Sequence, residues 1–554
     1  MKSRMKIGQH LVEKGLITED QLKQALDAQA KKDRFLGEIF VENGWVTEEQ
    51  LMESLAEQFK MQLVRLAETA VDPKLKEVFP LKVALHYKVM PLELKGTQLT
   101  IAIAAPQDIL LLDHVSLALR QKYVLNAVLA TGHEIDKAIS RFYGLGAETV
   151  DRILLREGQP QAQASAEPAV QDIQKSEEAS VVKLVNQFLL EAYQRRATDI
   201  HLEPFRDKIR LRYRVDGVLE TADLPDTMRR FFPAIISRIK VLSGLNLVEK
   251  RAPQDGRGSV TVGSQKLDLR VSVLPSSAGE GVVIRILPNA MLYNLSELGL
   301  ERRNLEIMQK MLAKPYGLMF VTGPTGSGKT TTLYSALKQI NTEERKIITI
   351  EDPVEYELPG IMQVPVNPQV GMGFAQGLRS MLRHDPDVMM VGEVRDVETA
   401  ELAIRIALTG HLVLSTLHTN DAASGFARLT DMGIPPYLLA SSVSCLVAQR
   451  LIRKICDKCR QEVPGVVPRS FHGEGCNACH RTGYNGRMAI YEVLPVTAEI
   501  KKLVLQKASV DEIRQLAVDQ GMTSLQTEGW AKVKEGLTSP EEVLRITSNE
   551  TMEI

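Results

Sequence analysis

The sequence lacks the features of a membrane-embedded or exported protein. No apolar run in its 554 residues approaches the roughly 18 that a membrane-spanning helix needs. The N-terminal stretch MKSRMKIGQHLVEKG carries charges where a signal peptide needs an apolar region. We therefore expect a cytoplasmic protein.

Cysteine is scarce and unevenly placed. Of five cysteines, Cys445 stands alone and is interpreted as a small buried hydrophobic residue. The other four form C-x2-C-x16-C-x2-C, which is typical of a zinc ribbon and too sparse for a disulfide scaffold. Four thiolates leave no position open for water, so we predict a structural zinc site. Its ligands would be Cys456, Cys459, Cys476 and Cys479.

The chain has no excess of either charge. With 68 basic and 69 acidic side chains the net charge is -1, which excludes nucleic-acid binding by bulk electrostatics and leaves only a local patch open. The length predicts about three or four domains at roughly 150 residues each. The composition, 25% charged and 44% hydrophobic, is that of a globular protein.

The first sixty residues contain two copies of one unit. Pairs of matching residues recur at a period of 29: Gly8 and Gly37, Gly15 and Gly44, Leu22 and Leu51, Leu26 and Leu55, Gln29 and Gln58. In each copy a short helix ends at a glycine, and Thr18 or Thr47 caps a second helix with Gln21 or Gln50 completing a capping box. Spacing alone leaves packed helical hairpins and a ligand site both open.

The rest of the chain predicts an α/β multidomain protein. A small α/β unit completes a domain over 1–145, residues 146–180 have the composition of a flexible linker, and 181–295 alternate as an α+β domain. From 296 to 554 the apolar runs GLMFVTG, KIITIED, DVMMVGE and HLVLSTLH alternate with helical patterns, which predicts a mostly parallel sheet followed by C-terminal helices.

The segment GPTGSGKT fits the phosphate-binding P-loop, with an apolar strand before it and a helix after it. We expect Lys329 to reach the β and γ phosphates of ATP and Thr330 to hold Mg²⁺. The full predicted nucleotide-binding segment is Gly323, Pro324, Thr325, Gly326, Ser327, Gly328, Lys329, Thr330 and Thr331.

Acidic residues follow two of the predicted strands. Glu351, Asp352 and Glu355 come after KIITI, and Glu393 comes after DVMMVG, so parallel strands would carry carboxylates to the P-loop edge. We expect water activation and Mg²⁺ binding there. His411 and His418 bracket the strand LVLSTLH, and their sensing a phosphate, lining a subunit boundary or being structural all stay open.

These motifs together resemble the hexameric ATPases of type II secretion and type IV pilus assembly, the GspE and PilB class. The resemblance lies in GPTGSGKTTTL, ITIEDPVEY, DPDVMMVGEVRD and ALTGHLVLSTLHTNDA, and with RATDIHLEPF and APQDGR it covers roughly 180–550. It implies a RecA-like core after a PAS-like domain, and the tetracysteine segment is similar to one common in family members that act in assembly.

The resemblance also implies roles for individual residues. Glu355 would be the water-activating base, Glu393 a Walker B carboxylate near Mg²⁺, and His411 and His418 the histidine-box pair. Arg214 corresponds to an arginine that can reach a phosphate, although arginines alternating on a strand are by default a solvated face. The alternatives for this role are Arg379, Arg383 and Arg395.

The N-terminal repeat is similar to the MshEN domain, which binds c-di-GMP. Its leading arginine is Lys6 in the first copy and Phe35 in the second, with Arg34 one place early. Because neither lysine nor phenylalanine replaces a planar guanidinium, we expect c-di-GMP to bind weakly or not at all.

The sequence thus predicts a cytoplasmic hexameric motor that hydrolyses ATP to power type IV pilus assembly or type II secretion, using ATP, Mg²⁺ and Zn²⁺. The resemblance implies docking on an inner-membrane partner, with membrane contact only through that partner and no nucleic acid. Two alternatives stay open: a DNA-translocating RecA-like ATPase and a nucleotide-sensing regulator.

Overall fold

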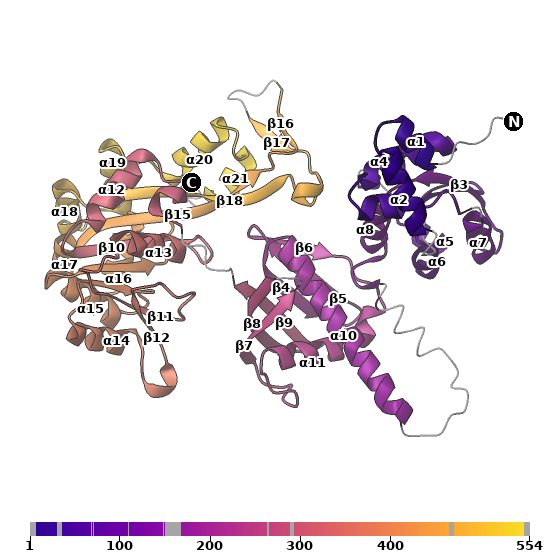
Figure 1. The fold of residues 1–554 in the computed structure, drawn as a ribbon. Coiled ribbons are helices and arrows are strands. Elements are labelled where there is room, and N and C mark those ends of the chain that lie inside the picture. Colours follow the sequence, from indigo (N-terminus) through magenta and orange to yellow (C-terminus); the bar gives the residue numbers. More distant parts are fainter. Residues whose placement is uncertain are drawn as a thin grey trace. The chain divides into compact units, whose positions relative to one another are not determined.

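The computed structural model describes residues 7–29, 36–67, 69, 71–108, 110–147, 149, 168–262, 265–287, 293–464 and 470–547 (Figure 1). The chain divides into two compact units, Met1–Ile286 and Leu287–Ile554. The division falls about ten residues before the boundary expected at 295, at the end of the last strand of the second predicted domain. No helix in the described part of the chain is both long and apolar enough to cross a membrane.

The N-terminal repeat forms two helical hairpins, as its capping signals predicted. The helices are α1 (Ile7–Glu13), α2 (Glu19–Gln29), α3 (Leu36–Glu42) and α4 (Glu48–Phe59). Thr47 and Gln50 exchange reciprocal hydrogen bonds of 3.0 and 3.2 Å, and Thr18 and Gln21 do the same at 2.8 and 3.2 Å. Both capping boxes are confirmed.

A small sheet packs with these helices around one core that runs from Leu11 to Phe142. The sheet has the order β1-β2-β3, with the first pair antiparallel and the second parallel. Its elements are α5 (Leu75–Val78), α6 (Leu81–Tyr87), β1 (Met90–Lys95), β2 (Gln98–Ile103), α7 (Leu111–Ala118), β3 (Val124–Leu129) and α8 (Gly132–Tyr143).

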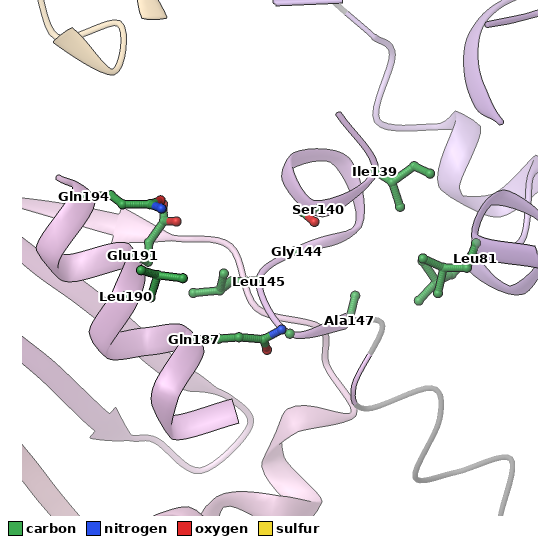
Figure 2. Close-up of a pocket in the computed structure, with 12 residues that line it drawn as sticks. Leu81, Ile139, Ser140, Gly144, Leu145, Ala147, Gln187, Leu190, Glu191 and Gln194 are labelled. Carbon is green, nitrogen blue, oxygen red and sulfur yellow. The ribbon is translucent and has the colours of Figure 1, made fainter. Parts of the chain in front are cut away.

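The prediction of a flexible linker over 146–180 is wrong for its second part. Helix α10 spans Pro168–Gln194, because the Ala, Gln, Glu and Lys of this segment are themselves good helix formers. Directly before the predicted linker, Leu145 donates its N–H to the Asp223 carbonyl at 2.9 Å. Leu145 also lines a pocket with Gln187 and Leu190 of α10 (Figure 2). Residues 150–167 lie outside the described residues.

The second half of the first unit is an α+β fold, as predicted. Helices α10 and α11 (Met228–Leu242) share a core with a six-stranded sheet of order β6-β5-β4-β9-β8-β7. The strands are β4 (Ala197–Pro204), β5 (Ile209–Val215), β6 (Val218–Ala222), β7 (Gln254–Val262), β8 (Gln265–Ser276) and β9 (Gly279–Leu287). On β5, Leu211 and Tyr213 enter the core while Arg210, Arg212 and Arg214 take the other face.

The second unit is built on a seven-stranded sheet of order β12-β11-β13-β14-β10-β15-β18. All of its pairs are parallel except β15 with β18. The strands are β10 (Gly317–Thr322), β11 (Ile347–Glu351), β12 (Met362–Pro365), β13 (Val388–Val391), β14 (Leu412–Leu417), β15 (Val443–Ile455) and β18 (Tyr484–Pro495). The predicted mostly parallel sheet is therefore confirmed.

This sheet is buried on both faces. Along β10, Leu318 and Phe320 enter one hydrophobic core, whereas Met319 and Val321 enter the other. The helices of the unit are α12 (Arg302–Leu312), α13 (Lys329–Ile340), α14 (Phe374–Met381), α15 (Val397–Leu408), α16 (Ser424–Asp431), α17 (Pro436–Ser442), α18 (Ala498–Leu505), α19 (Val510–Asp519), α20 (Leu525–Lys534) and α21 (Pro540–Thr547). Burial on both faces explains why these strands are continuous apolar runs.

Candidate active site

The P-loop joins the carboxyl end of β10 to the first turn of α13, as its sequence context predicted. Its glycines take backbone conformations that other residues adopt only with strain: φ is 80° at Gly326 and 90° at Gly328. Space is also restricted, because a Cβ on Gly328 would lie 2.7 Å from the Gln449 Nε2. The loop backbone can therefore wrap closely around an anion.

Lys329 supplies the positive charge of this loop. Its Nζ donates to the carbonyls of Gly323 at 2.7 Å and Pro324 at 3.1 Å. Burial, together with the nearby Arg450, lowers the pKa of Lys329 to about 8, and the carboxylate of Glu393 partly opposes that shift. The protein therefore stabilises the charge of the Lys329 ammonium only weakly, and a phosphate group entering the loop would supply the missing negative charge.

Glu393 and His418 lie at the same edge of the sheet. Glu393 follows β13 and is 15% exposed, and its carboxylate pairs with Arg395 and lies 3.4 Å from the His418 Nε2. Because β10, β13 and β14 are parallel, their carboxyl ends meet at one edge. The structure thus brings together the predicted residues Lys329, Glu393 and His418.

His411 lies at the opposite edge, so the two histidines of the predicted pair are not together. It precedes β14, and its Nδ1 lies 3.2 Å from the Ile406 carbonyl and 3.3 Å from the Thr409 Oγ1. A strand rises about 3.3 Å per residue, so the seven-residue spacing carries His411 the full length of β14 away from His418. Within one chain, His411 does not contribute to the P-loop edge.

The acidic residues after β11 differ in their surroundings. Glu351 is 3% exposed and accepts hydrogen bonds from the hydroxyls of Tyr334 and Thr349. Asp352 and Glu355 are exposed in the loop that follows. Of the three carboxylates expected at this strand end, Glu351 therefore is a structural group and the other two face solvent.

Of the arginines considered, Arg395 is the one that contacts a predicted site residue. Arg379 pairs with Glu398 at 2.5 Å, and Arg383 donates to the Arg379 carbonyl at 3.0 Å. Arg214 belongs to the first unit, where it donates to the Gly217 carbonyl at 3.0 Å and has its Nε 3.8 Å from Asp199.

Two polar residues on β15 that sequence reasoning missed also border the P-loop. Gln449 is 2% exposed, and its Oε1 accepts a 2.7 Å hydrogen bond from the Thr332 hydroxyl in α13. Arg450 donates to the carbonyl of Asn420 at 2.6 Å and lies beside Gly323, where its nearest guanidinium nitrogen is 3.1 Å from the position of a Cβ. Their signal was present, since a glutamine and an arginine interrupt the apolar run from Cys445 to Ile452.

The four predicted zinc ligands converge. Their sulfur atoms all lie within 4.8 Å of one another, with 3.8 Å between Cys456 and Cys476 and between Cys459 and Cys479. Around a tetrahedral zinc with Zn–S bonds of about 2.3 Å, sulfur atoms are roughly 3.8 Å apart. The cysteines follow β15 and β17 (Phe471–Gly473), and β16 (Arg460–Glu462) lies between the two pairs. The donor set fits zinc.

Comparison with known proteins identifies the family. Residues 174–545 match the model of the type II/IV secretion system protein family. The chain belongs to this family. Across 98% of the chain it is 39% identical to the type IV pilus assembly ATPase PilB of Myxococcus xanthus, of which 99% is covered. It is 42% identical to the type II secretion system protein E of Xanthomonas campestris, over 84% of each protein.

A solved structure supports the fold of this family member. The ATPase DotB of Legionella pneumophila superposes with a TM-score of 0.50 at 22% identity, covering 70% of this chain and 98% of DotB. The predicted secretion-ATPase family and RecA-like core are confirmed. An MshEN domain model matches residues 59–149, which confirms the predicted MshEN-like domain, although the match begins directly after the repeat on which the resemblance was based. Lys6, Arg34 and Phe35 lie outside the described residues, so weak c-di-GMP binding stays a prediction.

Proposed function

We propose that this chain is a motor ATPase that hydrolyses ATP to drive assembly of a type IV pilus or a type II secretion pseudopilus. The observation that carries the proposal is the convergence of Lys329, Glu393 and His418 beside the P-loop, at one edge of a parallel sheet. Membership of the type II/IV secretion system protein family supports the same function.

Each residue at this edge has a chemical task. Lys329 exchanges its two loop carbonyls for the β and γ phosphates, and the backbone N–H groups of residues 323–330 hold their oxygens. Thr330, in the first turn of α13, and Glu393 would hold Mg²⁺, which neutralises charge on the transferred phosphoryl group. Glu355 would accept the proton of the attacking water.

We further propose that the motor is a cytoplasmic hexamer that docks on an inner-membrane platform protein. An ATPase that moves a membrane-anchored filament must transmit force to a membrane partner. The N-terminal domain is the expected contact for that partner, and a zinc ion held by Cys456, Cys459, Cys476 and Cys479 would stabilise the ribbon that they form.

The first test is hydrolysis by purified variants. Lys329→Ala should abolish ATP turnover because it removes the charge that neutralises the phosphates, while the fold survives. Glu355→Gln should bind ATP and lose hydrolysis, since an amide cannot accept the proton. Wild-type turnover in Lys329→Ala would reject the ATPase, and normal turnover in Glu355→Gln would move the base to another residue.

The same preparation separates the alternatives. Strong stimulation of turnover by DNA would favour a DNA translocase. Failure to hydrolyse bound ATP in a single-turnover assay would favour a nucleotide sensor. Deleting the gene and scoring surface pili against exported proteins would distinguish the two filament systems.

A further inference from the structure

A buried polar network joins the P-loop helix to the loop that carries Glu355. Its centre is the Tyr334 hydroxyl on α13, which donates to the Glu351 carboxylate at the end of β11. The same oxygen accepts from the Glu355 backbone N–H at 3.4 Å and from the Gln363 Nε2 at 3.3 Å. Tyr334 is fully buried, so these bonds are sheltered from water.

Gln363 on β12 holds the same loop at two more points. Its Oε1 accepts from the Leu358 N–H at 2.7 Å, and its Nε2 donates to the Tyr356 carbonyl at 3.2 Å. The rings of Tyr334 and Tyr356 pack edge to face, with their centroids 4.7 Å apart. The loop backbone is thus fixed at residues 355, 356 and 358.

The Tyr334 hydroxyl is both a donor and an acceptor in this network, and the two N–H bonds of the Gln363 amide are shared among three acceptors. Burial, together with Glu351, raises the pKa of Tyr334 far above its ordinary range, so the hydroxyl keeps its proton and remains a donor to Glu351. The carboxylate of Glu351 also accepts from the Thr349 hydroxyl at 2.5 Å and from Gln363 at 3.1 Å. With three donors on it, Glu351 anchors the network and is not free to activate water.

The network connects the helix that would bind the phosphates with the loop that would activate the water. Helix α13 begins at Lys329, which faces the phosphates, and carries Tyr334 five residues later. We propose that Tyr334 is a positioning residue, whose hydroxyl sets the place of Glu355 relative to the phosphates bound by the P-loop. Gln363 and Glu351 hold that hydroxyl and the loop in fixed positions relative to each other. This inference rests on the proposed function, in which Glu355 is the base.

The test compares hydrolysis with ATP affinity in the full-length protein. Tyr334→Phe keeps the ring and loses the hydroxyl, and it should lower single-turnover hydrolysis by about 10- to 100-fold, the cost of a small misplacement. ATP affinity, measured with a fluorescent analogue, should stay at the wild-type value because the P-loop is untouched. Tyr356→Phe, a matched loss of a hydroxyl from the same ring pair, should leave both quantities unchanged.

Two further variants test that Tyr334 acts through Glu355. In a Glu355→Gln background, Tyr334→Phe should cause no additional loss of the residual single-turnover rate, because the effects of residues that act as one unit are not additive. Gln363→Met leaves the bond between Tyr334 and Glu351 in place, frees the loop, and should reproduce the selective loss of hydrolysis even if Tyr334→Phe folds poorly.

The outcomes separate this inference from the proposed function. Wild-type hydrolysis in both Tyr334→Phe and Gln363→Met, alongside an inactive Glu355→Gln, would overturn the positioning role alone. An equal loss of ATP affinity and hydrolysis in Tyr334→Phe would also overturn it, by showing a purely structural role in α13. Normal hydrolysis by Glu355→Gln would remove the base and the positioning role together.

Discussion

We expect Lys329 to make ATP binding depend on pH. Its pKa is about 8 in the free protein, and bound phosphates must raise it because they favour the charged ammonium. Below pH 8 the ammonium is already charged and affinity should be flat. Above pH 8 binding must take up a proton, so affinity should fall by up to about 10-fold per pH unit until the pKa of the complex is reached.

Titration of a fluorescent ATP analogue between pH 7 and 9.5, at constant Mg²⁺, measures this dependence. Lys329→Arg is the control, because a guanidinium with a pKa above about 12 stays charged throughout the range. A flat profile for the wild-type protein would contradict the shifted pKa. The same slope in Lys329→Arg would assign the titration to another group.

Gln449 provides a second prediction at the scale of single residues. Gln449→Leu keeps the size of the side chain, removes the 2.7 Å hydrogen bond from Thr332 and loosens the first turn of α13. Losing one buried hydrogen bond costs about 0.5–1.5 kcal/mol, so ATP affinity should fall by up to about 10-fold. Thr332→Val removes the other partner, and the double variant should be no worse than either single one. Additive losses would show that the contact does not support the loop.

The sequence predicts a functional feature when the residues that form it lie close together in the chain. The P-loop and the paired cysteines are contiguous motifs, and the structure places both as expected. The contact between Gln449 and Thr332 joins residues 117 positions apart, and the Tyr334 network joins three separate elements. Such contacts depend on strand order, which no local pattern carries.

At the scale of elements, one expectation failed for an identifiable reason. The start of α10 was assigned to a linker because it has few large apolar residues, although propensity alone can favour a helix. Apolar periodicity identifies packed elements better than it identifies helices with little packing.

The proposed zinc site gives a prediction at this scale. Cys476→Ser with Cys479→Ser should remove one zinc per chain and increase hydrogen exchange within residues 456–484, because metal binding and local folding are coupled. The P-loop should still bind ATP, because β15 pairs with both β10 and β18 beside it. The carboxyl end of β15 is also held by an ion pair between Arg453 and the buried Glu542 at 2.9 Å.

Elemental analysis of protein purified without chelator, exchange measurements and ATP titration would check this prediction. Cys445→Ser is the matched control, since it changes a buried cysteine outside the cluster and should leave the zinc content unchanged. Wild-type protein without zinc would remove the claim. Loss of ATP binding in the double variant would show that the ribbon supports the P-loop through β15.

At the scale of the whole molecule, the active site needs charge from outside the P-loop. In the proposed mechanism Lys329 and Mg²⁺ would act on one side of the phosphates, and an arginine from the other side would be worth roughly 10³ to 10⁵ in rate. Arg214 belongs to the first unit, its side chain is 37% exposed, and we propose that it supplies this charge when that unit closes over the nucleotide, in its own chain or across a ring. Closure on binding and opening after hydrolysis would form the power stroke, because a ligand favours the state with which it makes more contacts.

Arg214→Ala should therefore bind ATP nearly normally, hydrolyse it poorly and fail to support filament assembly. Arg212→Ala is the matched control, because Arg212 occupies the same face of β5 but is engaged by Glu203 at 2.6 Å. Mixing Arg214→Ala with Lys329→Ala chains should restore some hydrolysis only if the arginine acts between chains, since some interfaces would then carry both intact groups. Unchanged turnover in Arg214→Ala would reject this residue and shift the role to Arg379, Arg383 or Arg395, of which Arg395 already contacts Glu393.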